Sequence, residues 1–199
     1  MTRTAEYTFR EYCSSDEPSW LRCRVLSFLT TAYFDDVAAS KPLIEAPGFE
    51  LVAVSAGGTV VGVMDVAVNN SVGIIDTVAV HPDHRRHAIA STLLDRATRR
   101  GHALDLIALS AWTRDDPTAL SWYRAMDFVE SDHYLHVFAD RDSDPDEPAR
   151  AVERTRRGLD LRSAFLHAEL ADEIQLRQQF ARVHVCRRVT MTLRRADRP

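Results

Sequence analysis

The chain has 199 residues, of which 45 % are hydrophobic and 27 % charged, and this is the composition of a globular protein with room for one substantial core. Its 25 basic and 29 acidic side chains give a formal net charge of −4, which gives no support to nucleic-acid or membrane-surface binding. No apolar run reaches the roughly 18 residues of a transmembrane helix, and residues 1–10 lack the apolar stretch of a signal peptide, so we expect a cytoplasmic protein.

The amino-terminal part predicts a short strand followed by a long helix. Residues 7–11 alternate as a strand does, and Pro18 suits the first turn of a helix that begins beside it. Apolar residues then recur at helical spacing over residues 21–33. We therefore expect one long amphipathic helix that ends near residues 41–42.

The next part of the chain predicts an antiparallel meander of three strands. The β-rich segments are residues 49–56, 60–68 and 72–80. Gly57-Gly58 and Asn69-Asn70 separate them, and both pairs are typical of hairpin turns.

Helical and extended patterns alternate in the following segment. Apolar residues line one face over residues 88–100, and Gly101 suits the position just after a helix. The segments that follow predict a buried strand, a short helix and a strand, at residues 104–112, 118–126 and 128–138. A parallel crossover between the strands on either side of the first of these helices is expected.

A sharp change in composition marks the last quarter of the chain. Residues 140–148 are charged, contain proline and predict a loop, whereas residues 149–157 and 169–181 are compatible with helices. Residues 183–193 alternate as a last strand. We interpret residues 139–180 as an insertion between the last two strands.

Together these elements predict an α/β fold, in which helices flank a mixed, mostly antiparallel sheet with a long insertion in its last hairpin. We expect a single domain over residues 1–199.

The segment around residue 88 predicts an anion site. A β-branched strand runs into a basic turn with Arg85 and Arg86, and a helix begins near Ala88. The first N–H groups of a helix lack intrahelical acceptors, and the helix dipole adds partial positive charge there. Small side chains at Ala88 and Ala90 allow a ligand to approach the main chain closely. A pyrophosphate group fits this arrangement.

Arg85, Ala88 and Ala90 also resemble the acyl-CoA-binding motif of the GNAT superfamily of N-acetyltransferases, Gln/Arg-x-x-Gly-x-Gly/Ala, with Ala88 in place of the usual glycine. The resemblance implies acetyl-CoA as cosubstrate. Main-chain groups of Val78 and Val80 are expected to hold the pantetheine arm. The cosubstrate-binding residues implied are Val78, Ala79, Val80, Arg85, Arg86, His87, Ala88, Ile89, Ala90, Ser91 and Asp116.

Residues 116–128 resemble a second GNAT motif, Asn-x-x-Ala-x-x-Phe-Tyr-x-x-x-Gly-Phe. Asp116 stands at the asparagine position and Asp127 at the glycine position. The resemblance implies that Tyr123 protonates the departing CoA thiolate, which is general-acid catalysis. The alternative is that Tyr123 packs its ring in the core beside Trp122.

An amine must be neutral to attack a thioester, so a base or a water chain is required. Asp76, expected to share one face of its strand with Ile74 and Val78, is our candidate, with Asp65 on the neighbouring strand as a second. Either carboxylate has the alternative of being an ordinary residue at the rim of the sheet, or of attracting a cationic acceptor.

Other polar residues favour structural roles. His81, His84 and His87 lie within seven residues, but Pro82 prevents them from stacking on one helix and neighbouring arginines repel a cation, so we expect no metal site. The cysteines form no Cys-x-x-Cys pair and favour reduced thiols, and Cys186 has no partner that would activate it as a nucleophile.

We conclude that the sequence favours an N-acetyltransferase that uses acetyl-CoA, by direct attack of an amine in a ternary complex. The acceptor is a primary amine of a small molecule or peptide; nucleic-acid and membrane partners are not expected, and a homodimer is one possible assembly. The alternative functions are a weakly active or inactive acyl-CoA-binding regulatory module, and a scaffold whose insertion makes dimer contacts.

Overall fold

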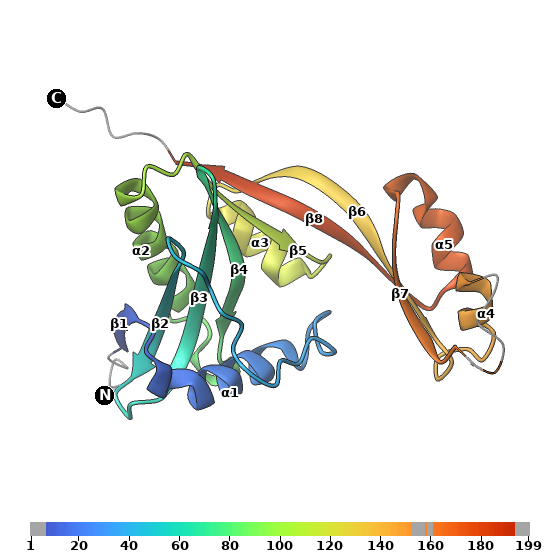
Figure 1. The fold of residues 1–199 in the computed structure, drawn as a ribbon, viewed down its shortest axis with the longest axis horizontal. Coiled ribbons are helices and arrows are strands. Elements are labelled where there is room, and N and C mark those ends of the chain that lie inside the picture. Colours follow the sequence, from blue (N-terminus) through green and yellow to red (C-terminus); the bar gives the residue numbers. More distant parts are fainter. Residues whose placement is uncertain (1–6, 153–157, 159–160, 194–199) are drawn as a thin grey trace.

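The computed structural model describes residues 7–152, 158 and 161–193, in which eight strands form one sheet in the order β1-β2-β3-β4-β5-β8-β6-β7 (Figure 1). The strands are β1 (Tyr7–Glu11), β2 (Phe49–Ser55), β3 (Val60–Asn69), β4 (Val72–Val80), β5 (Ala108–Thr113), β6 (Val129–Asp140), β7 (Ser163–Ala168) and β8 (Arg182–Thr192). The α-helices are α1 (Glu17–Phe28), α2 (Ile89–Ala103), α3 (Pro117–Ala125), α4 (Glu147–Ala151) and α5 (Glu173–Gln179). Only β4 and β5 pair in parallel within this described sheet, so the predicted mixed, mostly antiparallel α/β fold is confirmed.

The central strands are covered on both faces. Side chains alternate along β3, so Val63 packs against α1 with Trp20, whereas Met64 packs against α2 with Leu93. All four side chains are fully buried. None of the helices in the described ranges is long and apolar enough to cross a membrane.

α1 ends at Phe28, so the predicted extension of this helix towards residue 41 is wrong. The Thr31 hydroxyl donates to the Phe28 carbonyl, 2.8 Å away, and the chain leaves the helix axis there. Arg114 and Arg182 both donate to the Ala32 carbonyl. Contacts with residues far along the chain thus hold this segment outside the helix. The local sequence pattern cannot reveal such contacts.

The predicted end of α2 at Gly101 is also wrong, because the helix continues to Ala103. A Cβ atom at Gly101 would lie 2.9 Å from Cδ1 of Leu193, so the glycine serves close packing. After the helix, Asp105 adopts a φ of 54°, and β5 begins at Ala108, four residues later than the predicted strand.

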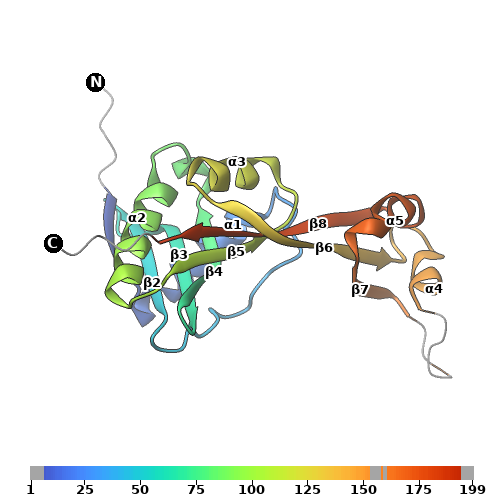
Figure 2. The same ribbon diagram turned by 90° about the horizontal axis from the view of Figure 1, so that it is seen from above.

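β6 and β8 continue past the end of β5 and form, with β7, α4 and α5, an arm that extends from the body of the protein (Figures 1 and 2). We use "arm" for the described residues between 134 and 186. One face of its strands carries Leu135, Val137 and Val183, which pack with Phe180 in a separate core. The carboxylate of Glu147, 1 % exposed, accepts hydrogen bonds from the N–H groups of Asp140, at the end of β6, and of Ala181, just before β8.

The opposite face of the arm carries aromatic rings. Phe138 stacks on Phe165 with centroids 4.7 Å apart, and His136 stacks on His167 at 5.1 Å. Burial, together with the nearby Arg114 guanidinium, lowers the pKa of His136 to about 4. His136 is therefore neutral at physiological pH.

The antiparallel pairing predicted between residues 128–138 and 183–193 is confirmed. Of the predicted helix at 149–157, residues 153–157 lie outside the described ranges, and α4 begins two residues earlier than expected. The edge strand β7 was not predicted. That residues 139–180 are an insertion within one domain stays a prediction.

A buried charge cluster lies between α1 and the sheet. The Asp65 carboxylate on β3 is 1 % exposed, and its Oδ2 lies 3.2 Å from Nζ of Lys41, which also pairs with Glu50. Oδ1 of Asp65 has no hydrogen-bond partner among the described residues. Burial raises the pKa of Asp65 to about 7, against the opposing effect of Lys41.

This raised pKa predicts a pH-dependent stability. An unfolded aspartate titrates near pH ~4, so between about pH 4 and 7 the folded state holds a proton that the unfolded state releases. The free energy of unfolding is therefore expected to fall from pH 5 to pH 8 in the wild type relative to Asp65→Asn, in urea titrations. Asp105→Asn, an exposed control, should follow the wild type. Equal pH dependence of wild type and Asp65→Asn would contradict the assignment.

Candidate active site

β4 and β5 lie side by side over only part of their length. Residues 72–75 pair with residues 108–111, after which β4 continues along β3 and β5 along β8 (Figure 1). A β-bulge at Asp76 bends β4 at the same point, because Ile75 and Thr77 face successive residues of β3. Beyond the bulge, the β5 side of β4 has no strand partner in the described sheet.

The main chain of Val78 and Val80 faces this free edge. The His81 N–H donates to the Val61 carbonyl, and bonded residues alternate along an antiparallel pair. Residues 77 and 79 therefore bond to β3, whereas the N–H and C=O groups of Val78 and Val80 point the other way. The side chain of Ala79 packs with the core under α1.

The turn between β4 and α2 contains two left-handed residues. Arg86 has a φ of 65°, and Ala88, at the N-cap of α2, has a φ of 56°. Only glycine adopts this conformation without strain, so the methyl group of Ala88 costs roughly 1 kcal/mol. Asp127 likewise has a φ of 61°. Both positions where a glycine of the resembled motifs is replaced thus keep the glycine conformation.

The first turn of α2 presents free main-chain donors. The first intrahelical bond runs from the Thr92 N–H to the Ala88 carbonyl, so the N–H groups of Ile89, Ala90 and Ser91 have no acceptor within the helix. These groups lie directly after the free edge of β4 along the chain. Unbonded donors of this kind at a helix start are the groups that bind anions in proteins.

Arg85 and Arg86 differ in their availability. Nη2 of Arg85 donates to the Ser27 carbonyl at the end of α1, 3.0 Å away, whereas Arg86 is exposed and makes no hydrogen bond with a described residue. The imidazole Nδ1 of His87 lies 2.8 Å from the Arg85 carbonyl and closes the turn. The predicted basic turn is therefore present, with one of its two arginines tied to α1.

α3 begins beside α2 and is held to it. The Asp116 carboxylate caps α3 by accepting from the Ala119 N–H at 2.8 Å. Nε1 of Trp122 donates to Oγ of Ser91 at 3.3 Å, which joins α3 to the first turn of α2. The two predicted motifs are thus in contact.

Tyr123 lies in the core between these helices. It is 4 % exposed and contacts the rings of Trp122 and Phe128. Its hydroxyl has no hydrogen-bond partner in the described part of the chain. Burial, assisted by the nearby Tyr33, raises the pKa of Tyr123 far above its usual value, so the hydroxyl keeps its proton.

Sequence reasoning did not identify Tyr33 or Arg114 as site residues. The Tyr33 hydroxyl accepts from the main-chain N–H of Arg114 at the end of β5, 2.6 Å away. The Arg114 guanidinium is buried and pairs with Asp35 at 3.1 Å. No local sequence signal could have found them, because the apolar spacing over residues 21–33 placed Tyr33 on a helix.

Asp76 is exposed at the bulge, and its carboxylate accepts from the Thr77 hydroxyl at 3.3 Å. The predicted alternation that placed Asp76 on one face with Ile74 and Val78 is wrong. The bulge breaks that alternation, because Ile75 and Val78 both pack against the core under α2.

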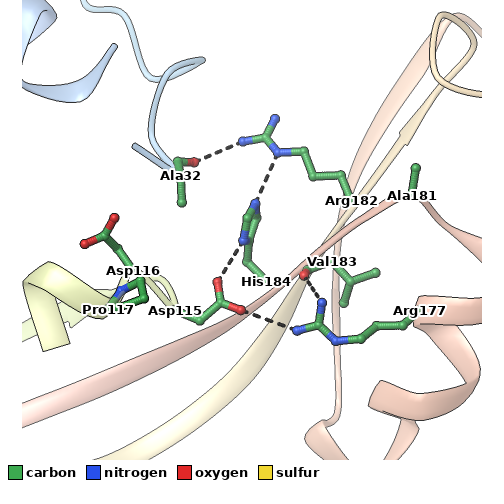
Figure 3. A pocket seen from close by; sticks show the side chains of 9 residues that line it. All are labelled: Ala32, Asp115, Asp116, Pro117, Arg177, Ala181, Arg182, Val183 and His184. Carbon is green, nitrogen blue, oxygen red and sulfur yellow. Dashed lines mark hydrogen bonds and ion pairs between the residues drawn. The ribbon is translucent and has the colours of Figure 1, made fainter. Parts of the chain in front are cut away.

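A cavity of about 430 Å³ lies where α3, the segment after α1 and the arm meet (Figure 3). His184 donates from Nδ1 to Oδ1 of Asp115 at 2.8 Å, and Arg177 donates to Oδ2 of Asp115 at 3.3 Å. Burial opposes the charge of Asp115, but the hydrogen bond from His184 keeps its pKa below the usual value. The lining residues are Ala32, residues 115–117, Arg177 and residues 181–184.

Comparison with protein families supports the resemblance given by the two motifs. The model of the acetyltransferase (GNAT) family matches residues 6–128, which include β1–β5 and α1–α3. No curated protein matches the sequence.

Solved structures with this fold are numerous and distant in sequence. The ribosomal-protein-S18-alanine N-acetyltransferase from Escherichia coli is 11 % identical, covers 96 % of both chains and gives a TM-score of 0.60. A GNAT acetyltransferase from Staphylococcus aureus is 12 % identical, covers 95 % of this chain and 100 % of its own, and gives 0.57. PaiA N-acetyltransferase from Thermoplasma acidophilum, in complex with coenzyme A, is 12 % identical, covers 64 % and 92 %, and gives 0.54. At these identities the likeness shows the fold.

The left-handed conformation of Ala88 predicts that glycine substitutions at Ala88 and at Ala90, both at the start of α2, have opposite effects on stability. Ala88→Gly should raise the free energy of unfolding by up to ~1 kcal/mol, because the strained methyl group is removed. Ala90→Gly, at a helical position, should lower it by about 0.5–1 kcal/mol. Chemical denaturation measures both. A loss of stability in Ala88→Gly equal to that in Ala90→Gly is the contrary outcome.

Proposed function

The chain belongs to the GNAT acetyltransferase family, and we propose that it transfers an acetyl group from acetyl-CoA to a primary amine of a small molecule or peptide. The observation that carries the proposal is the free edge of β4, which leads directly into the left-handed turn and the unbonded first turn of α2. The family binds acyl-CoA, and solved proteins of this fold include N-acetyltransferases and a complex with coenzyme A.

Two parts of acetyl-CoA, the pantetheine arm and the pyrophosphate, have regions that suit them. The pantetheine arm carries amide groups that suit the outward N–H and C=O groups of Val78 and Val80, in the manner of an added strand. The pyrophosphate suits the main-chain donors of residues 89–91 and the charge of Arg86. Arg85 contributes its remaining donors and positive charge, while Ala88 sets how closely phosphate approaches.

The proposed reaction is direct attack in a ternary complex. The neutral amine nitrogen forms a bond to the thioester carbonyl carbon, and the carbon–sulfur bond breaks as the tetrahedral intermediate collapses. Tyr123 donates its proton to the departing thiolate; its hydroxyl has no other partner among the described residues, and burial, which raises its pKa, keeps it protonated until then. Tyr123 then regains a proton through solvent, which receives the proton that the amine lost, so that CoA leaves as the thiol.

Asp76 is the proposed acceptor of the proton that the amine loses, directly or through water. It is exposed at the bulge where the β4 edge becomes free. Its negative charge also favours the approach of an ammonium group. Asp65 is too enclosed for this role, because it is 1 % exposed and paired with Lys41.

A regulatory acyl-CoA-binding module is the second candidate function. The strained methyl group of Ala88 favours it, because the position that approaches the pyrophosphate is not glycine. Such a module would bind acetyl-CoA without transferring acetyl to any amine. Release of free CoA thiol, measured with an amine panel, separates the two functions.

Tyr123→Phe tests the proposed proton donor, because it keeps the ring in the core and removes only the hydroxyl. We expect kcat to fall on the order of 10²-fold, with KM for acetyl-CoA little changed. Tyr12→Phe, at the other side of the sheet beneath α1, is the matched control and should retain full kcat. An unchanged kcat in Tyr123→Phe would show that Tyr123 only packs in the core and does not donate the proton.

A further inference from the structure

The cavity between α3 and the arm has the size and place of a binding site for the acceptor. Its volume of about 430 Å³ suits a small molecule. It begins at Asp116, the N-cap of α3, and includes Ala32, the residue before Tyr33. Asp116 is also one of the residues that the second motif implies for cosubstrate binding, so a molecule in the cavity borders the proposed cosubstrate site.

Charges of both signs line this cavity. Asp115 and Asp116 lie at the start of α3, whereas Arg177 and Arg182 come from α5 and β8 of the arm (Figure 3). His184 lies between them, with Nδ1 donating to Asp115 and Nε2 accepting from Nε of Arg182 at 3.3 Å. Asp116 makes no ion pair with a described residue, so it suits an ammonium group, whereas the arm supplies the positive charges that suit an anion.

The guanidinium donors of Arg182 are used mostly in contacts within the protein. Its guanidinium donates to both carboxylate oxygens of Asp35 and to the Ala32 carbonyl. Burial would raise the pKa of Asp35, but the hydrogen bonds from Arg182 and Arg114 hold it at about 2, so this ion pair persists across the physiological range.

Arg177 keeps donors free. Of its five N–H groups, one bonds Glu173 at 2.8 Å, one the Val183 carbonyl at 2.7 Å and one Asp115 at 3.3 Å. Its side chain is 43 % exposed, and the bond to Asp115 is the longest of the three. Arg177 is therefore the group in the cavity that can form a forked pair with an incoming oxyanion.

We propose that the cavity binds the acceptor, and that the acceptor is a zwitterionic amine whose carboxylate pairs with Arg177, such as an amino acid. This rests on the proposed acetyl transfer. A carboxylate fits better than a dianion, because a single arginine with two free N–H groups matches one negative charge while two aspartates lie nearby. The amine then lies towards Asp116 and Tyr33, at the end where the proposed cosubstrate site begins.

The wild-type protein alone gives the first test. CoA release is measured with amino acids and with the carboxamides of the same amino acids, which keep the amine and lack the negative charge. We expect kcat/KM to be at least about 10-fold higher for the acid of the best pair. Equal or better use of the carboxamides would overturn the proposal, while leaving the acetyltransferase function intact.

Arg177→Gln gives the second test. KM for the amino acid should rise about 10-fold, with KM for its carboxamide and the Kd of acetyl-CoA unchanged. Arg150→Gln is the matched control, because Arg150 is another arm arginine paired with an aspartate, Asp144, but does not line the cavity. Equal losses for acid and carboxamide in Arg177→Gln would overturn the proposal.

A binding measurement without turnover distinguishes a failure of the carboxylate site from a failure of the transfer function. Suppose that no amine is acetylated, but that amino acids raise the melting temperature of the wild type and not of Arg177→Gln. This result would support the carboxylate site and contradict the transfer function. If acetylation occurs without any dependence on the carboxylate or on Arg177, the transfer function remains and the assigned acceptor class is wrong.

Discussion

The short pairing between β4 and β5 is the constraint on which the rest of the site depends. β5 must pair with β8 on its other side through Thr113, whereas the bulge at Asp76 redirects β4. The free main chain of Val78 and Val80 follows from this divergence. α2 follows β4 and α3 follows β5, so the divergence of the two strands also separates the starts of the two helices. The bond from Trp122 to Ser91 keeps them in contact.

A second constraint joins the arm to the body. Asp35 accepts hydrogen bonds from Arg114 at the end of β5 and from Arg182 on β8, so three segments far apart in the sequence meet at one carboxylate. The rings of Phe34 and Phe138 lie against the Arg182 guanidinium, 4.4 and 3.8 Å from it. Partly buried contacts of this kind are worth more than fully exposed ion pairs. They fix one wall of the cavity relative to the proposed cosubstrate edge.

The sequence predicted the elements whose signals are local. Alternation and the paired turn residues located the meander, and the basic turn before residue 88 located the start of α2. The end of α1 at Phe28 was mispredicted, because arginines more than 80 residues away hold the Ala32 carbonyl. The Asp115–His184 pair spans 69 residues and has no local pattern at all. Long-range ion pairs, and a bulge that a strict alternation cannot show, account for what sequence reasoning missed.

We propose that the free edge of β4 and the first turn of α2 form an acetyl-CoA site. Isothermal titration calorimetry of acetyl-CoA, with the wild type and with Ala88→Val, measures it most directly. A β-branched side chain at a left-handed position facing the pyrophosphate should block its approach. We predict saturable binding by the wild type and at least about 10-fold weaker binding by a folded Ala88→Val variant, which corresponds to ~1.4 kcal/mol. Absence of wild-type binding at millimolar acetyl-CoA, or equal affinity of the two proteins, would contradict it.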